Sequence, residues 1–162
     1  MYTNLIGLYA MIRKVLVNEV PDIKRLVDPF VNEGLILPKS LLSLYTSVRD
    51  FWIMIDDNDP DQILGCCALQ VSWVDIAEIR TLAVRKESHG NGIGRSLVQA
   101  CMDEAVELGL KQLFTLTFVP EFFKKLGFSE VDKSTLPNKI WADCIHCRFF
   151  PDCREIALTY QL

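Results

Sequence analysis

The sequence predicts an α+β fold, and three observations support that prediction. Half of the 162 residues are apolar, which is enough to bury one sizeable core. Short runs of alternating apolar residues are typical of strands, whereas other runs repeat their apolar residues at helical spacing. The helical runs come early in the chain, a hairpin of strands follows, and the second half alternates strand and helix.

The first half of the chain contains runs typical of three strands and two helices. The strand runs lie at 12–17, 51–55 and 63–73. The helical runs lie at 18–34 and 39–48. Asn18 can cap the first helix and Gly34 can end it. The stretch at 56–62 is rich in Asp, Asn and Pro and predicts a hairpin turn, so the strands on either side of it should pair antiparallel.

The second half begins with a strand at 77–84, a glycine-rich turn and a helix that ends at Gly109. One side of that helix is apolar: Leu97, Val98, Cys101, Met102, Ala105 and Leu108. A strand at 111–117, a short helix that starts at Pro120 and a return into a strand after Gly127 complete the pattern.

Composition and charge exclude several classes of protein. Seventeen basic and twenty-one acidic side chains leave a formal charge of −4, so there is no overall positive field for nucleic acid. No apolar run reaches the roughly 20 residues of a membrane span. The six cysteines lack the spacing of a small secreted disulfide scaffold. Reduced thiols, a cytoplasmic location and no membrane partner are therefore expected.

The length favours a single domain. The N-terminal stretch has no basic residue before its apolar part and no small-residue cleavage site, so it is not interpreted as a signal peptide. A second methionine, Met11, stands just before the first predicted strand. Residues 1–10 are therefore interpreted as an extension and residues 11–162 as one domain, with a cysteine-containing segment at 137–162.

Three glycines stand in five positions between a strand and a helix, at Gly90, Gly92 and Gly94. A P-loop is excluded because Arg95 rather than lysine follows the last glycine. The dinucleotide fingerprint also fails, because the spacing would require glycine at 95 or 97. Two interpretations remain: a plain tight turn, or a turn whose backbone N–H groups at the helix N-terminus bind an anion such as a pyrophosphate.

The segment "HGNGIG" resembles the acyl-CoA signature Q/R-x-x-G-x-G/A of the GNAT N-acetyltransferase superfamily. "LAV" before it and "FFKKLGF" after it stand where that family has its cofactor strand and its closing helix. The resemblance runs from about Met11 to Val131. His89 stands where the family usually has Gln or Arg, and Phe123 stands where many members have the tyrosine that protonates the leaving thiolate.

The resemblance implies the GNAT fold: a mixed, mostly antiparallel central sheet that splays into an acetyl-CoA cleft, with helices on both faces. It implies acetyl-CoA as co-substrate and leaves the general acid unassigned. In this interpretation the main chain of the cofactor strand contacts the pantetheine arm, and the N–H near Leu82 polarises the thioester carbonyl. The turn holds the pyrophosphate. The implied cofactor-binding residues are Leu82, Ala83, Val84, His89, Gly90, Asn91, Gly92, Ile93, Gly94, Arg95 and Phe123.

Glu78 is the candidate general base. An amine is mostly protonated at neutral pH, so transfer to it needs a proton acceptor, direct or through one water. Glu78 stands four residues before Leu82, which by strand alternation would place both on one sheet face, and family members with a glutamate base carry it at this offset. The alternative is a solvated carboxylate or a partner for Arg80.

Four stretches, "IRKV", "LPKSLLSLYTSVRDFW", "EIRTLAV" and "VPEFFKKLGF", together resemble the short amino-acid acetyltransferases related to the acetyltransferase domain of N-acetylglutamate synthase, the first enzyme of arginine biosynthesis. That resemblance implies L-glutamate as the small-molecule acceptor, with its two carboxylates held by Arg13 and Lys39. Arg49 and Arg80 are further cations that could line the cleft. A protein or peptide amine acetyltransferase and a non-catalytic acyl-CoA sensor stay open as alternatives, as does a homodimer.

The C-terminal segment holds Cys144, Cys147 and Cys153. The spacing looks like half of a zinc site, but a structural zinc site wants four ligands and His146 is awkwardly placed beside Cys147. Reduced thiols are favoured over zinc, and no metal is assigned.

Overall fold

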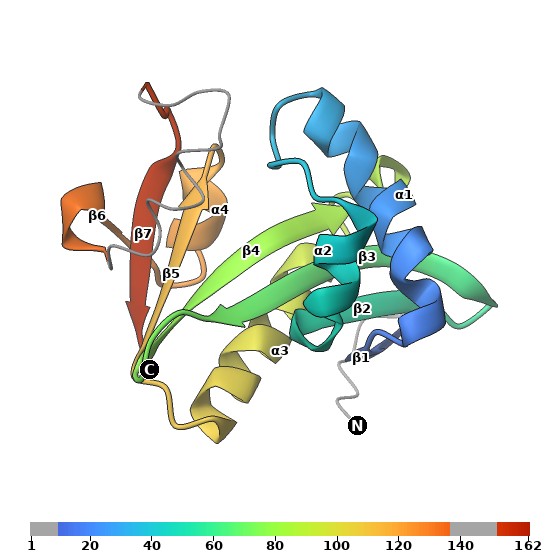
Figure 1. Cartoon of the computed structure of the whole chain (residues 1–162), viewed down its shortest axis with the longest axis horizontal. Coiled ribbons are helices and arrows are strands. Elements are labelled where there is room, and N and C mark those ends of the chain that lie inside the picture. The colour runs from blue at the N-terminus through green and yellow to red at the C-terminus, as the bar shows by residue number, and fades with distance from the viewer. Residues whose placement is uncertain (1–9, 137–151) are drawn as a thin grey trace.

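The computed structural model describes residues 10–136 and 152–162. They form one seven-stranded sheet in the order β1-β2-β3-β4-β5-β7-β6 (Figure 1). The strands are β1 (Ala10–Lys14), β2 (Phe51–Asp56), β3 (Asp59–Val71), β4 (Ile76–Val84), β5 (Gln112–Thr117), β6 (Ser129–Val131) and β7 (Ile156–Gln161). Neighbouring strands pair antiparallel except β4 and β5, which pair parallel. The predicted mixed, mostly antiparallel sheet is thus confirmed.

Helices cover both faces of the sheet (Figure 1). They are α1 (Val20–Asn32), α2 (Leu41–Thr46), α3 (Ile93–Glu107) and α4 (Pro120–Lys124). We call the side covered by α1 and α2 the α1 face and the opposite side the α3 face. Single 3₁₀ turns lie at Val17–Glu19, Val48–Asp50, Lys86–Ser88 and Lys133–Thr135. No helix in the described part of the chain is long and apolar enough to cross a membrane.

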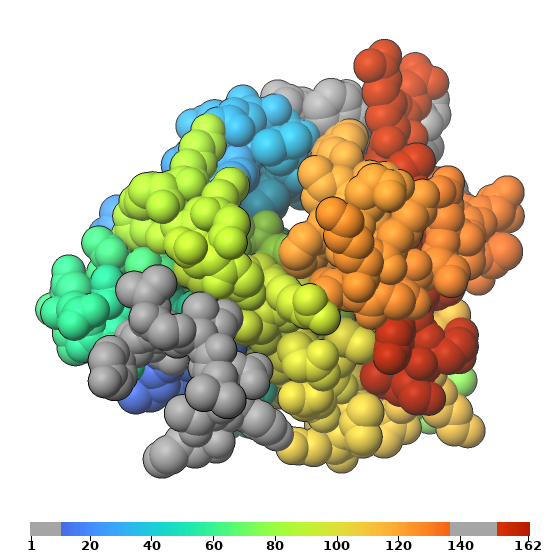
Figure 2. Space-filling model, turned by 180° about the vertical axis from the view of Figure 1, so that it is seen from behind, coloured from blue at the N-terminus to red at the C-terminus, as the bar shows by residue number. Residues whose placement is uncertain are grey.

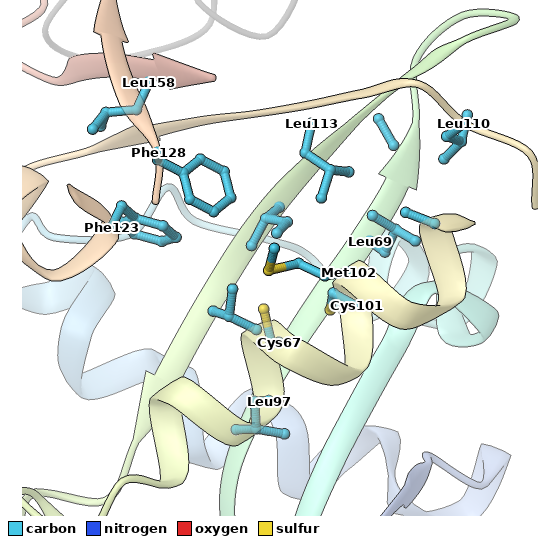
Figure 3. Packing of buried hydrophobic residues seen from close by; sticks show 14 of the residues in the cluster. Cys67, Leu69, Leu97, Cys101, Met102, Leu110, Leu113, Phe123, Phe128 and Leu158 are labelled. Atoms are coloured by element: carbon cyan, nitrogen blue, oxygen red, sulfur yellow. The ribbon is translucent and has the colours of Figure 1, made fainter. Parts of the chain in front are cut away.

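Each face of the sheet has its own core, because inward-pointing residues alternate along every strand. On the α3 face, Leu97 and Cys101 of α3 pack with Cys67, Leu113 and Leu158 of the sheet (Figure 3). Most of the apolar side predicted for this helix packs here, but Leu108, just after its last residue, is 57% exposed. Complete burial of such a leucine contributes roughly 1.5–3 kcal/mol. The two cores hold β2, β3 and β4 rigidly between the helices.

The sheet splays open between β4 and β5. These strands are paired only at Ile76–Glu78 against Gln112–Phe114. The Thr115 hydroxyl then donates a hydrogen bond of 2.9 Å to the Ile79 carbonyl, and beyond that point β5 is paired only with β7, which lies on its other side along the whole strand. Figure 1 shows β4 and β5 diverging from their shared end. The main chain at the end of β4 therefore lies at an opening in the sheet.

A β-bulge in β4 changes its direction at the same place. The register with β3 shifts between Cys66 and Ala68, and Thr81 has a φ of +54°. A positive φ is unusual for a residue with a branched Cβ, so the surrounding sheet must hold it. The bulge inserts one residue into the alternation of β4.

Three elements differ from the sequence prediction. β1 ends at Lys14 rather than 17, because a 3₁₀ turn begins at Val17 and the Glu19 carboxylate accepts a hydrogen bond of 2.7 Å from the Leu16 N–H. β3 starts at Asp59, which shortens the hairpin turn. β7 was not predicted as a separate strand, because its pairing depends on β5 and β6 rather than on a local pattern.

Candidate functional site

The opening between β4 and β5 leads into a cavity of about 630 Å³. Figure 2 shows the molecule hollowed there, between the residues that end β4 and those of α4. Apolar side chains from the end of α1 and the segment after it form part of the wall: Phe30, Leu35, Ile36 and Leu37. β4, the glycine-rich turn, β5, α4 and the residues before β7 supply the remaining walls.

The glycine-rich turn presents backbone to this cavity. Gly90 has a φ of +83° and Gly92 a φ of +75°, values that glycine adopts without a Cβ penalty. Gly92 is the N-cap of α3 and provides no side-chain cap. The N–H groups of the first turn of a helix have no partner within the helix. Uncapped N–H groups at the positive end of a fifteen-residue helix fit a bound pyrophosphate.

Gly94 lies where a side chain would narrow the cavity. A Cβ at this position would lie 3.4 Å from the Phe122 ring and 3.8 Å from Val84. Both of these residues line the cavity, as do Ile93 and Arg95. Asn91 is exposed and is not among the described lining residues.

His89 lines the cavity, but its ring also has a structural contact. His89 Nε2 lies 2.8 Å from the Val84 carbonyl oxygen and so ties the turn to the end of β4. A neutral ring that donates from Nε2 has only an acceptor at Nδ1. His89 can then donate to a phosphate only when the ring is protonated.

Leu82, Ala83 and Val84 line the cavity at the splayed end of β4. The prediction that Glu78 and Leu82 share a sheet face is wrong. Ile79 and Leu82 both pack on the α3-face core, although they are three residues apart, because the bulge at Thr81 shifts the alternation. Glu78 neighbours Ile79 and points to the α1 face. Both residues nevertheless line the cavity.

Glu78 and Arg80 line the cavity from the α1 face of β4. Their side chains are only 14% and 13% exposed, and Glu78 Oε2 lies 3.5 Å from Arg80 Nη1. The same Nη1 donates a hydrogen bond to the Gln70 side-chain oxygen on β3. The ion pair that the sequence left open as an alternative is present, and it lies inside the cavity rather than on a solvated surface.

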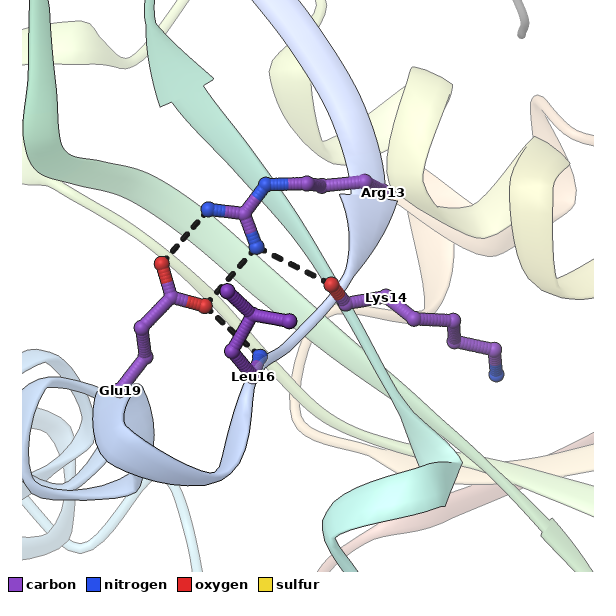
Figure 4. Close-up of polar contacts among 4 residues, drawn as sticks. All are labelled: Arg13, Lys14, Leu16 and Glu19. Carbon is purple, nitrogen blue, oxygen red and sulfur yellow. Dashed lines mark hydrogen bonds and ion pairs between the residues drawn. The ribbon is translucent and has the colours of Figure 1, made fainter.

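Lys39 lines the cavity from the segment before α2. Arg13 does not: β1 is the edge strand, separated from β4 by β2 and β3. Its guanidinium donates hydrogen bonds of 2.8 and 2.6 Å to the two Glu19 carboxylate oxygens and one of 3.1 Å to the Lys14 carbonyl (Figure 4). The hydrogen bonds with Arg13 lower the pKa of Glu19. Arg13 is thus neutralised outside the cavity, and we do not retain it as a substrate residue.

Arg49 is likewise not among the described lining residues; its carbonyl accepts a hydrogen bond of 2.9 Å from Lys14 Nζ. Two residues that the sequence analysis gave no role do line the cavity, Cys153 and Glu155. They come from the segment just before β7, where the cysteine spacing marked Cys153 without assigning it to this cavity and no motif marked Glu155. Only the pairing of β7 with β5 brings this segment to the splay.

Phe123 lines the cavity and is 3% exposed. Its ring contacts Phe122 edge-on, with centroids 5.0 Å apart, and Phe128 at 5.4 Å. An apolar ring cannot protonate a leaving group, so this position supplies shape only.

Cys144 and Cys147 lie outside the described residues. Within 10–136 and 152–162, no three His, Cys, Asp or Glu side chains are grouped so that they could hold a metal ion. Cys66, Cys67, Cys101 and Cys153 are free thiols. Burial raises the pKa of the Cys66 thiol to about 12, so this group stays neutral and unreactive at physiological pH.

Comparisons with known proteins agree on one family. Residues 47–130 match the acetyltransferase (GNAT) domain. An amino-acid acetyltransferase from Mycobacterium tuberculosis is 35% identical over 140 residues, which cover 86% of this chain and 79% of that protein.

Two solved structures have the same fold. A Mycobacterium tuberculosis protein in complex with CoA and NLQ has a TM-score of 0.80 at 32% identity, covering 94% of this chain and 99% of that chain. N-acetylglutamate synthase from Neisseria gonorrhoeae, in complex with coenzyme A and N-acetyl-glutamate, has a TM-score of 0.85 at 26% identity. The match covers 95% of this chain and 35% of the synthase chain.

Proposed function

The chain belongs to the GNAT family and is an N-acetyltransferase that uses acetyl-CoA, and from that premise we propose that its acceptor is the α-amine of a free amino acid, with L-glutamate preferred. The observation that carries this proposal is that one cavity holds Glu78, Arg80 and Lys39 next to the glycine-rich turn. Cations suit an acceptor with carboxylates, and a carboxylate suits its amine. The relatives named above support an amino-acid acceptor.

Acetyl-CoA supplies an activated acetyl group as a thioester. In the proposed site the turn from His89 to Arg95 holds its pyrophosphate with backbone N–H groups, and Leu82, Ala83 and Val84 pair through their main chain with the pantetheine arm. The N–H near Leu82 donates to the thioester oxygen as negative charge develops there. The bulge at Thr81 supports this role, because it turns the strand at the opening of the sheet.

Glu78 is proposed as the base that takes the proton from the α-amine, directly or through one water. A new N–C bond then forms as the C–S bond breaks. Arg80, beside it on β4, is proposed to hold the α-carboxylate, and Lys39 the side-chain carboxylate. Holding both carboxylates orients the amine toward the thioester, and this orientation raises the rate of acetyl transfer.

A spectroscopic assay of free thiol release, run with acetyl-CoA and a panel of amines, tests the proposal. L-glutamate should be the best acceptor, aspartate weaker, and glutamine or lysine poor, because an acceptor without the second carboxylate loses the charge-assisted contact proposed for Lys39. The product would be N-acetylglutamate, the first intermediate of arginine biosynthesis. If glutamine is the preferred acceptor, the assignment of glutamate is wrong, but the assignment of a free amino acid as acceptor stands.

The panel also includes peptides and a no-acceptor control. Faster turnover of a peptide N-terminus or of a lysine side chain would instead support a protein acetyltransferase. Tight acetyl-CoA binding without turnover of any amine would support an acyl-CoA sensor.

A further inference from the structure

Glu155 is a cavity carboxylate that has no part in the mechanism above. It lies just before β7, whose first residue, Ile156, is paired with Thr117 of β5. It is only partly exposed and lines the cavity together with Glu78 and Arg80. Partial burial removes water from this carboxylate, which disfavours its charged form. A nearby cation should offset that cost.

The geometry places Glu155 on the same side of the sheet as Glu78. Two residues further on, Ala157 packs with Phe114, and Phe114 is paired in register with Glu78. Glu155 stands one residue before β7, so the alternation of β7 extended by one residue directs it to the face of Glu78, and both residues line the cavity from opposite sides of the splay. The cavity between them is where an acceptor would lie.

The charges around Glu155 leave room for a cationic group. Within the described residues, its carboxylate accepts one hydrogen bond, from the Cys153 thiol at 3.8 Å. Burial raises its pKa above the ordinary carboxyl value, while the Cys153 thiol and the charges of Lys133 and Arg80 act against that rise. Glu155 and Arg80 line the same cavity, and Arg80 is close enough for its positive charge to act on the Glu155 carboxyl.

We propose that Glu155 binds the ammonium group of the acceptor, while Arg80 binds the adjacent carboxylate. A positive and a negative side chain that line the same cavity are complementary to a zwitterion, which carries an ammonium and a carboxylate on one carbon. This inference rests on the proposed function and deepens it: it names Glu155 as the residue that binds the acceptor ammonium, with Glu78 left as the base.

The test compares Glu155→Gln and Glu78→Gln, using whichever acceptor the wild type acetylates fastest. Glu155→Gln should raise the KM for the acceptor about ten- to a hundredfold, with kcat within about threefold of wild type, because a charge-assisted contact is lost in binding. Calorimetric titration should give an unchanged Kd for acetyl-CoA. Glu130→Gln, the same chemical change at an exposed site on β6, is the matched control and should change nothing.

The α-methyl ester of the acceptor amino acid separates the two charged contacts. It keeps the ammonium group and the side chain but lacks the α-carboxylate. Glu155→Gln should therefore weaken the amino acid and its ester by the same factor, whereas Arg80→Gln should weaken the amino acid more than the ester. Glu155→Asp, which keeps the charge, should recover part of the affinity.

The pH dependence of kcat/KM is a further test, because a purely structural role of Glu155 would not change it. The acceptor needs ionised Glu155, so kcat/KM should fall as the pH falls through the pKa of Glu155, which lies above the ordinary carboxyl range. In Glu155→Gln the part of the acidic limb due to Glu155 should be lost, which leaves only the limb that protonation of the proposed base Glu78 produces.

Three results would overturn the role of Glu155. They are an unchanged KM in Glu155→Gln, a loss of kcat with KM intact, and a parallel loss of acetyl-CoA affinity, which would mean a structural role. If the fastest acceptor is not an amino acid, the proposed function fails, while the comparison of Glu155→Gln with Glu78→Gln still tests the ammonium contact.

Discussion

The two halves of the cavity are built in different ways. The half proposed to bind the cofactor, here called the cofactor half, comes from one continuous segment, residues 82–95, which contains the glycine-rich turn. The half proposed to bind the acceptor, here called the acceptor half, is assembled from four separate segments, at 30–39, 78–80, 115–119 and 153–155. A site made of consecutive backbone can be recognised as a motif. A site made of distant side chains depends on which charges the fold brings together and which it neutralises elsewhere.

Arg13 and Arg80 show how the fold brings some charges into the cavity and neutralises others elsewhere. Each is an arginine on a strand, and each has a glutamate partner. Arg13 is bound by both oxygens of Glu19 at the sheet edge, whereas Arg80 lies in the cavity with its glutamate at 3.5 Å. The identity of the residue is the same, and only the position in the sheet places one of them in the cavity.

The largest expected effect lies in the cofactor half. Gly92→Val should weaken acetyl-CoA binding by at least about a hundredfold, because a β-branched side chain cannot adopt a φ of +75° without strain and would cover the backbone N–H groups. Isothermal titration calorimetry measures the change.

The matched control is Gly109→Val, at the other end of α3. Gly109 has a φ of +76° and open space around its Cβ position. It should lose stability for the same backbone reason and keep acetyl-CoA affinity. If the two variants bind acetyl-CoA with equal affinity, the glycine-rich turn is not part of the cofactor site.

The second effect lies in the acceptor half. Glu78→Gln should lower kcat about 10²–10⁴-fold with acetyl-CoA affinity unchanged, the loss typical of a missing general base. The residual rate should rise with pH, because the amine then loses its proton without help. Steady-state kinetics from neutral to alkaline pH measure both features. Near-wild-type turnover at neutral pH would assign the proton transfer to another group.

The comparison of cations predicts a smaller effect. Lys39→Ala should raise the KM for glutamate about tenfold, as expected for a lost charged contact, without affecting acetyl-CoA. Arg13→Ala should leave that KM unchanged and destabilise the protein by about 1 kcal/mol or less, because its ion pair with Glu19 is partly exposed. Kinetics and thermal unfolding of both variants check this. A raised KM in Arg13→Ala would return that residue to the acceptor site.

The smallest effect is expected at Phe123, at the boundary of the two halves. Phe123→Tyr should change kcat by less than about threefold, since a thiol with a pKa near 8.5 is already a tolerable leaving group. Rates measured with saturating substrates decide this. A large acceleration would mean that departure of the thiolate limits the reaction.

Much of the fold could be predicted from the sequence because its signals are local. The apolar side of α3 and the glycine-rich turn were found from spacing alone. β7 and Glu155 were missed for the opposite reason, since the strand is defined by its pairing with β5 and β6. The face of Glu78 was predicted from regular alternation, and a single bulge at Thr81 changed its relation to Leu82.

The sequence by itself determined the α+β class, the family and the backbone segment of the cofactor half, because helix periodicity, strand alternation and glycine spacing act over a few neighbouring residues. The tertiary structure alone decided where the sheet splays, which side of β4 carries Glu78 and which cations reach the cavity. These properties depend on hydrogen bonds and charges between segments far apart in the chain. Glu19 neutralises Arg13, and the pairing of β7 with β5 carries Glu155 into the cavity.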